Sequence, residues 1–220
     1  MIKLVLFDFD ETICLTEEAC FHLENETAQS MGFSPMSREI HQSTWGKPLK
    51  HAITIRVPGI DPETFMTEVM KRSKKYLHDG RLDSIGQDRL KVFDELIAMG
   101  KKIAILTSRT YDEVEHLIDP NHVISEKVER IYHMEEGSYV KPDPRVFDKP
   151  LADFNCLPEE AVYIGDAVSD AQAANGAGLH FIAYIESTIR DESQFAGHHV
   201  DFFAYSFEDV LKYVRLQTNQ

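Results

Sequence analysis

The 220-residue chain has little cysteine, little positive charge and no apolar run of membrane length. Its three cysteines, Cys14, Cys20 and Cys156, are an odd number without metal-ligand spacing, so we expect reduced thiols and no disulfide framework. The 37 acidic residues outnumber the 23 lysines and arginines, and the formal charge of −14 argues against nucleic acid or anionic membranes as partners. Since no charged-then-apolar leader opens the sequence, the cytoplasm is the expected location.

What the chain does contain is a series of short apolar runs separated by helical patterns. Strands buried on both faces are expected at residues 3–7, 103–106, 161–164 and 181–184, with a weaker candidate at 128–131. Strands that alternate with helices require right-handed crossovers. We therefore expect an α/β fold built on a Rossmann-like, doubly wound parallel sheet.

Local signals predict where several helices begin. Residues 90–99 carry a helical apolar stripe. Thr110 and Ser169 are each followed three residues later by Glu or Gln, which fits a capping box, and Asp143 precedes a proline in the manner of an N-cap. These three positions should each open a helix after a strand and loop.

The segment between the first strand and residue 90 does not alternate in this way. Helices are expected to begin at Thr16 and at Asp61, and a stretch of this length is too long for a plain loop. We expect a catalytic core of residues 1–13 and 86–220, and a small helical insertion of residues 14–85.

Polar side chains follow the carboxyl ends of the predicted strands, where ligands bind in open parallel sheets. Carboxylates that gather there repel one another unless a divalent cation lies between them, and oxygen ligands suit Mg²⁺. A carboxylate beside such an ion can attack phosphorus and form an aspartyl phosphate. The candidate site residues are Asp8, Asp10, Thr107, Ser108, Arg109, Lys141, Asp166 and Asp170.

Four stretches of the sequence, DFDET, ILTSRT, VKPDPRVF and YIGDAVSDAQAANGAG, occur in this order between residues 8 and 178. In order and spacing they resemble the four motifs of the haloacid dehalogenase-like hydrolase superfamily. The insertion after the first motif resembles the helical C1 cap of that superfamily. The likeness is to its C1-capped phosphatases, which include phosphoglycolate phosphatase and β-phosphoglucomutase-like enzymes.

The resemblance implies a role for each matching residue. Asp8 would be the nucleophile and a metal ligand. Asp10 would be the general acid and base, and would bind Mg²⁺ through its backbone carbonyl. Glu11 departs from the pattern, because many relatives have glycine there and glycine eases unusual backbone angles.

The later motifs imply the rest of the site. Thr107 would hydrogen-bond the phosphoryl group, and Lys141 would balance the charge of the nucleophile and the phosphate. Asp166 would bind the metal, and Asp170 would hold the metal's waters or neighbouring ligands. For substrate contacts we add Ser108, Arg109 and, in a candidate cap loop at residues 44–48, Lys47.

The sequence thus predicts a Mg²⁺-dependent phosphohydrolase that cleaves a small organic phosphomonoester through an aspartyl phosphate. Two alternatives stay open. A phosphomutase of the β-phosphoglucomutase type would have the same catalytic residues and a similar cap, and a non-catalytic binding protein could retain the fold. A small phosphorylated metabolite is the expected partner, but its identity and the oligomeric state do not follow from the sequence.

Overall fold

The computed structural model describes residues 1–187 and 189–218. The chain divides into two compact units, Met1–Ile13 with Ile85–Gln220, and Cys14–Ser84. Within the described residues, no helix combines the length and the apolar character needed to cross a membrane. The two units are described in turn.

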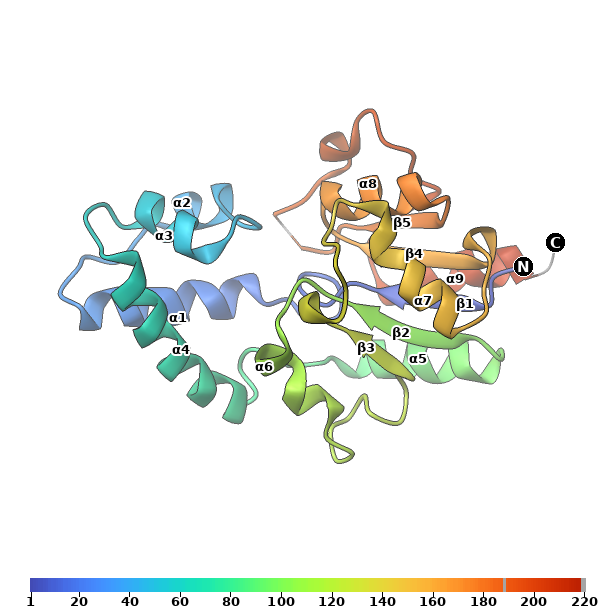
Figure 1. Cartoon of the computed structure of the whole chain (residues 1–220), viewed down its shortest axis with the longest axis horizontal. Coiled ribbons are helices and arrows are strands. Elements are labelled where there is room, and N and C mark those ends of the chain that lie inside the picture. The colour runs from blue at the N-terminus through green and yellow to red at the C-terminus, as the bar shows by residue number, and fades with distance from the viewer. Residues whose placement is uncertain (188, 219–220) are drawn as a thin grey trace. The chain divides into compact units, whose positions relative to one another are not determined.

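The first unit is built on a six-stranded sheet whose neighbouring strands are all parallel (Figure 1). The strand order is β3-β2-β1-β4-β5-β6, so successive strands are added first on one side of β1 and then on the other. The expected parallel α/β fold is therefore confirmed. The strands are β1 Leu4–Phe7, β2 Lys102–Leu106, β3 Arg130–Tyr132, β4 Ala161–Gly165, β5 His180–Tyr184 and β6 Phe202–Ala204.

The two ends of the sheet differ from the sequence prediction. Strand β3 begins at Arg130, two residues later than the 128–131 candidate. The Glu129 amide already donates to the backbone of β2, but the residue-by-residue pairing of the two strands starts at Arg130. Strand β6 was not predicted. Its three residues are too few to show an alternating pattern, and it pairs only at the β5 edge of the sheet.

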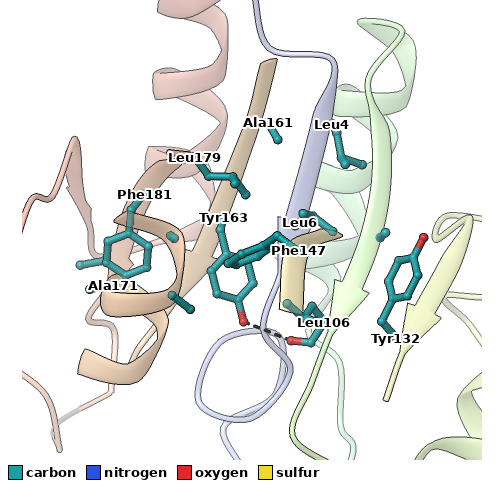
Figure 2. Close-up of a cluster of buried hydrophobic side chains, with 14 of the residues drawn as sticks. Leu4, Leu6, Leu106, Tyr132, Phe147, Ala161, Tyr163, Ala171, Leu179 and Phe181 are labelled. Carbon is teal, nitrogen blue, oxygen red and sulfur yellow. Dashed lines mark hydrogen bonds between the residues drawn. The ribbon is translucent and has the colours of Figure 1, made fainter. Parts of the chain in front are cut away.

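Helices cover both faces of this sheet (Figure 1). On one face Phe7 of β1 lies between Phe93 of α5 and Phe207 of α9, with ring centroids 5.2 and 5.5 Å away. On the other face Leu4 and Leu6 pack with residues of the 3₁₀ turn η3 (Pro144–Phe147) and of α8 (Figure 2). The alternation of β1 side chains between the two faces explains why its whole run is apolar. The helices are α5 Gln87–Ala98, α6 Tyr111–Val114, α7 Asp148–Asp153, α8 Val168–Ala177 and α9 Phe207–Thr218.

Two of the three predicted helix starts are correct. Thr110 and Glu113 form the capping box at α6, and the Asp143 carboxylate accepts from the Arg145 amide at 3.0 Å. That second helix begins as the 3₁₀ turn η3, Pro144–Phe147, before α7. The Ser169 prediction is wrong, because the N-cap of α8 is Ala167, two residues earlier, and Asp170 accepts from the Ala167 amide at 3.0 Å.

The second unit consists of helices packed around their own apolar core. Leu23, Ile53 and Phe65 are buried at its centre. The predicted start at Asp61 is correct, since its carboxylate accepts from the Thr64 amide at 2.8 Å. The helices are α1 Glu17–Ser30, α2 Arg38–Ser43, α3 Leu49–Arg56 and α4 Pro62–His78.

A buried charge network joins α1, α2 and α3 of this unit. Arg56 donates to both carboxylate oxygens of Glu24 at 2.7 and 2.6 Å, and His41 Nδ1 lies 2.6 Å from Glu17. Burying charges costs solvation, which close pairing offsets. The substitution Arg56→Ala would leave Glu24 buried with only the His41 ring, whose Nε2 lies 3.4 Å away, as a partner.

Candidate active site

The backbone of the sheet fixes the first two candidate residues. Asp8 directly follows β1, and its amide donates to the Ile164 carbonyl of β4 at 2.8 Å. Thr107 directly follows β2, and its amide donates to the Tyr132 carbonyl of β3 at 3.0 Å. Ladder hydrogen bonds therefore continue one residue beyond each strand and hold both residues at the carboxyl edge. This edge lies where the strand order reverses, between β1 and β4.

Lys141 brings two acidic motifs together. Its Nζ lies 2.9 Å from Asp8 Oδ1 and 2.7 Å from Asp170 Oδ1, and its side chain is only 8% exposed. Asp8 comes from the first motif and Asp170 from the start of α8. One ammonium group thus links residues that are more than 160 positions apart in the sequence.

Asp8, Asp166 and Asp170 form a buried cluster of carboxylates. One oxygen from each lies within 4.8 Å of the others, a spacing at which the three could hold a metal ion. The cluster depends on Gly165, because a Cβ there would lie 2.4 Å from Asp170 Oδ2. The last residue of β4 must therefore lack a side chain for Asp170 to occupy this position.

Burial has the largest effect on the pKa values of Asp8 and Asp166. It raises the pKa of Asp8 to about 7, although Lys141 acts in the opposite direction. Burial and then Asp170 raise the pKa of Asp166 well above its usual range, against the effect of Arg190. Lys141 behaves differently, since burial lowers its pKa but the two neighbouring aspartates more than compensate and raise it. Lys141 is therefore a permanent cation at this edge.

The donor set fits a divalent cation. Three carboxylates meet two cations, Lys141 and Arg190, whose Nε lies 2.9 Å from Asp166 Oδ2. If all three acids are ionised, one negative charge stays uncompensated in a buried place, and a cation would remove this cost. Carboxylate oxygens are also the donors that hard divalent ions prefer.

Asp10 lies beside this cluster but its side chain has a different partner. Arg109 donates to Asp10 through Nη2 at 2.7 Å and through Nε at 3.0 Å, and its guanidinium lies over the Phe9 ring. We expected Arg109 to bind substrate. The structure instead pairs it with the expected general acid, so a contact with substrate stays a prediction and would require this ion pair to open.

The other predicted substrate residues are exposed. Ser108 follows Thr107 at the edge of the sheet, and Lys47 belongs to the second unit. The roles of both residues stay predictions. Thr107, Ser108 and Lys141 are among the residues that line a cavity of about 190 Å³ in the first unit, but the three clustered aspartates do not line it.

Glu11 adopts the backbone conformation that glycine favours. Its φ is +56°, in the left-handed region, and its side chain is buried. This angle costs a residue with a Cβ roughly 1 kcal/mol or more. Glu11 therefore keeps the backbone turn after Asp8, but with local strain.

Sequence reasoning missed two residues of this site. Tyr163 was assigned only to a buried strand, yet its hydroxyl lies 3.0 Å from Lys141 Nζ. Arg190 follows β5 in a segment without any recognisable pattern. A tyrosine in an otherwise aliphatic strand was the signal that could have identified the first, whereas no local signal marks the second.

The structure is that of an α/β protein whose acidic and basic groups gather at the carboxyl edge of a parallel sheet, where ligands bind in such folds. The model of the haloacid dehalogenase-like hydrolases matches residues 5–184, and the chain belongs to this family. The resemblance drawn from the four motifs is therefore confirmed, as is the expectation of an enzyme of this class.

Named relatives match over most of their length. The chain is 24% identical to phosphoglycolate phosphatase of Rhodobacter capsulatus, with 94% of each protein covered. It is 28% identical to protein CbbY of Cereibacter sphaeroides, with 90% of each covered. Among solved structures, CbbY from Rhodobacter sphaeroides in complex with phosphate superimposes with a TM-score of 0.77 at 24% identity, covering 96% of each chain.

Proposed function

We propose that this chain is a Mg²⁺-dependent phosphatase that cleaves a small organic phosphomonoester through an aspartyl phosphate on Asp8. The observation that carries the proposal is Lys141, which pairs with Asp8 inside a cluster of three buried carboxylates. A permanent cation beside Asp8 favours the ionised carboxylate, which is the form that can bond to a phosphoryl group. The relative named phosphoglycolate phosphatase supports a phosphate ester as the substrate class.

In the first half-reaction, the ionised carboxylate of Asp8 attacks phosphorus. The bond between phosphorus and the leaving oxygen breaks as the new bond to Asp8 forms. Protonated Asp10 gives its proton to the leaving oxygen, which departs as an alcohol. Because Asp10 pairs with Arg109, its carboxyl must first leave that guanidinium.

In the second half-reaction, a water molecule attacks the phosphorus of the aspartyl phosphate. Asp10, now ionised, takes a proton from this water, and the bond between Asp8 and phosphorus breaks. Inorganic phosphate and the original state of both aspartates result. Lys141 and the Thr107 hydroxyl would stabilise the negative charge of the transferring group in both steps.

Mg²⁺ would be held by the side chains of Asp8 and Asp166 and by the backbone carbonyl of Asp10, with Asp170 supporting its waters. When bound, it would neutralise charge between the phosphate and the carboxylates. The units at residues 1–13 with 86–220 and at 14–85 would act as catalytic core and cap, with Lys47 on the cap. The net charge of −14 supports a small metabolite in place of a polyanion.

The test is release of inorganic phosphate from a panel of small phosphomonoesters in the presence of Mg²⁺. Asp8→Asn should abolish release, because an amide cannot form the acyl phosphate at a useful rate. Asp112→Asn is the matched control, since Asp112 is exposed in the first turn of α6. It should keep wild-type activity.

Two results would overturn the proposal. Rearrangement of a sugar phosphate that depends on a bisphosphate primer, without net phosphate release, would identify a phosphomutase. Binding of phosphorylated metabolites with no turnover of any kind would identify a binding protein that retains the fold.

A further inference from the structure

Tyr163 is a polar residue inside an apolar cluster. It lies in β4 with none of its surface exposed, and its ring packs edge to face on Phe147 with centroids 4.9 Å apart. Figure 2 shows its hydroxyl pointing toward Leu106, at the carboxyl end of β2. Phenylalanine would fill the same space, so packing explains the ring but not the hydroxyl. A buried hydroxyl is costly unless it is hydrogen-bonded.

The hydroxyl contacts groups from three motifs. It donates to the Leu106 carbonyl at 3.1 Å, accepts from Lys141 Nζ at 3.0 Å and lies 3.4 Å from Asp170 Oδ1. Burial raises the pKa of Tyr163 well above its usual range, so the hydroxyl keeps its proton for the carbonyl. Leu106 is the residue before Thr107. One oxygen atom therefore connects the lysine to the strand end that carries the predicted phosphoryl-binding hydroxyl.

These contacts account for all three protons of the lysine. An ammonium group has three donors, and the nearest acceptors of Lys141 are Asp8 Oδ1 at 2.9 Å, Asp170 Oδ1 at 2.7 Å and the Tyr163 oxygen at 3.0 Å. With the two carboxylates alone, the third N–H of the ammonium group would have no fixed acceptor. A lysine has a flexible four-carbon stem, so a third fixed acceptor restricts where its charge can lie.

We infer that Tyr163 is a positioning residue, whose hydroxyl holds the Lys141 ammonium beside Asp8 and links it to Leu106 at the end of β2. This inference rests on the proposed function, because it assigns to Lys141 the stabilisation of the transferring phosphoryl group. Tyr163 itself does not touch the reacting atoms. It acts by keeping the cation at a set distance from them.

The experiment compares Tyr163→Phe with Tyr132→Phe. Tyr132 is also a buried tyrosine of this sheet with a hydrogen-bonded hydroxyl, but that hydroxyl bonds Asp153 and points to the opposite end of the strands (Figure 2). Both variants lose one hydroxyl and keep the ring. Thermal melting of each measures any general loss of stability.

For Tyr163→Phe we expect kcat to fall about ten- to a hundredfold, the effect of losing a hydrogen bond to a charged group. KM should stay within about twofold, because Lys141 acts on the transition state. Affinity for an aluminium fluoride mimic of the phosphoryl group in transfer, measured with Mg²⁺, should fall by a similar factor to kcat. A purely structural role would not link these two losses while sparing KM. Tyr132→Phe should change neither.

An unchanged kcat and mimic affinity in Tyr163→Phe would overturn the inference, and so would equal losses in the Tyr132→Phe control. A wild-type chain that hydrolyses no phosphomonoester would instead refute the proposed function. If Tyr163→Phe does not fold, a crystal structure of the wild-type fluoride complex decides. Lys141 Nζ should then contact the fluoride in place of one carboxylate oxygen and keep its contact with the Tyr163 oxygen. Loss of the tyrosine contact on binding would refute the assignment.

Discussion

The substitution Gly165→Ala should inactivate the site, because its added methyl group would displace Asp170. A Cβ at this position would lie 2.4 Å from Asp170 Oδ2, 2.6 Å from its Cγ and 2.8 Å from its Cβ. No real side chain tolerates such distances, so Asp170 must move. It is fully buried, and the movement would break its bonds with the Ala167 amide and with Lys141.

The size of the effect follows from what is broken. Overpacking a close-packed core costs about 1–3 kcal/mol, and removing one partner of a buried ion pair costs about 3–5 kcal/mol. The methyl group displaces Asp170 without removing it, so the second cost is incurred only in part, and we expect about 3 kcal/mol in total. For a domain of this size that corresponds to a fall in Tm of roughly 6–12 °C. Lys141 would also lose its contact with Asp170, and we expect kcat to fall about a hundredfold, which corresponds to an activation barrier higher by about 3 kcal/mol.

The assay is calorimetric melting combined with phosphate release per folded protein. Gly137→Ala is the control, because the nearest atoms to its added methyl group are at 3.7 and 3.8 Å, an ordinary contact. It should melt and react like the wild type. A Gly165→Ala protein that matched this control in both measurements would show that Asp170 has room to move and that its contact with Lys141 is not needed.

Three further predictions concern the metal and the acid. EDTA should remove phosphatase activity and Mg²⁺ restore it, whereas Ca²⁺, with longer bonds and less strict geometry, should support little; full activity in chelator would contradict the metal assignment. Burial raises the pKa of Asp8 to about 7 and also raises the pKa of Asp166. Without metal, the folded chain therefore keeps protons on these acids that the unfolded chain releases. The free energy of unfolding should fall as the pH rises from about 4 through 7. Added Mg²⁺ should therefore raise Tm more at pH 8 than at pH 5, and equal shifts would show that these groups do not bind it. Asp10→Asn should lose most turnover but still bind a fluoride mimic, because it keeps the backbone ligand and removes the proton donor; an unchanged rate on a substrate with a poor leaving group would exclude this role.

Much of the fold could be predicted because its signals are local. The apolar runs of β1, β2, β4 and β5 reflect burial on both faces, and Thr110 and Asp61 cap helices through bonds that reach only three residues along the chain. Where two local patterns compete, the outcome is less certain. At α8, Asp170 and not Ser169 makes the opening contact, since the backbone enters the helix two residues earlier than a cap at Ser169 would require.

The order of the motifs along the sequence determined which residues gather at the sheet edge, because parallel strands bring their carboxyl ends together whatever the loops between them. The partners within that edge were decided by tertiary structure. Arg109 pairs with Asp10, Arg190 with Asp166 and Tyr163 with Lys141, across separations of 99, 24 and 22 residues. No pattern of neighbouring residues encodes such contacts. They arise because buried carboxylates and ammonium groups need close partners, and only the folded chain determines which side chains can reach them.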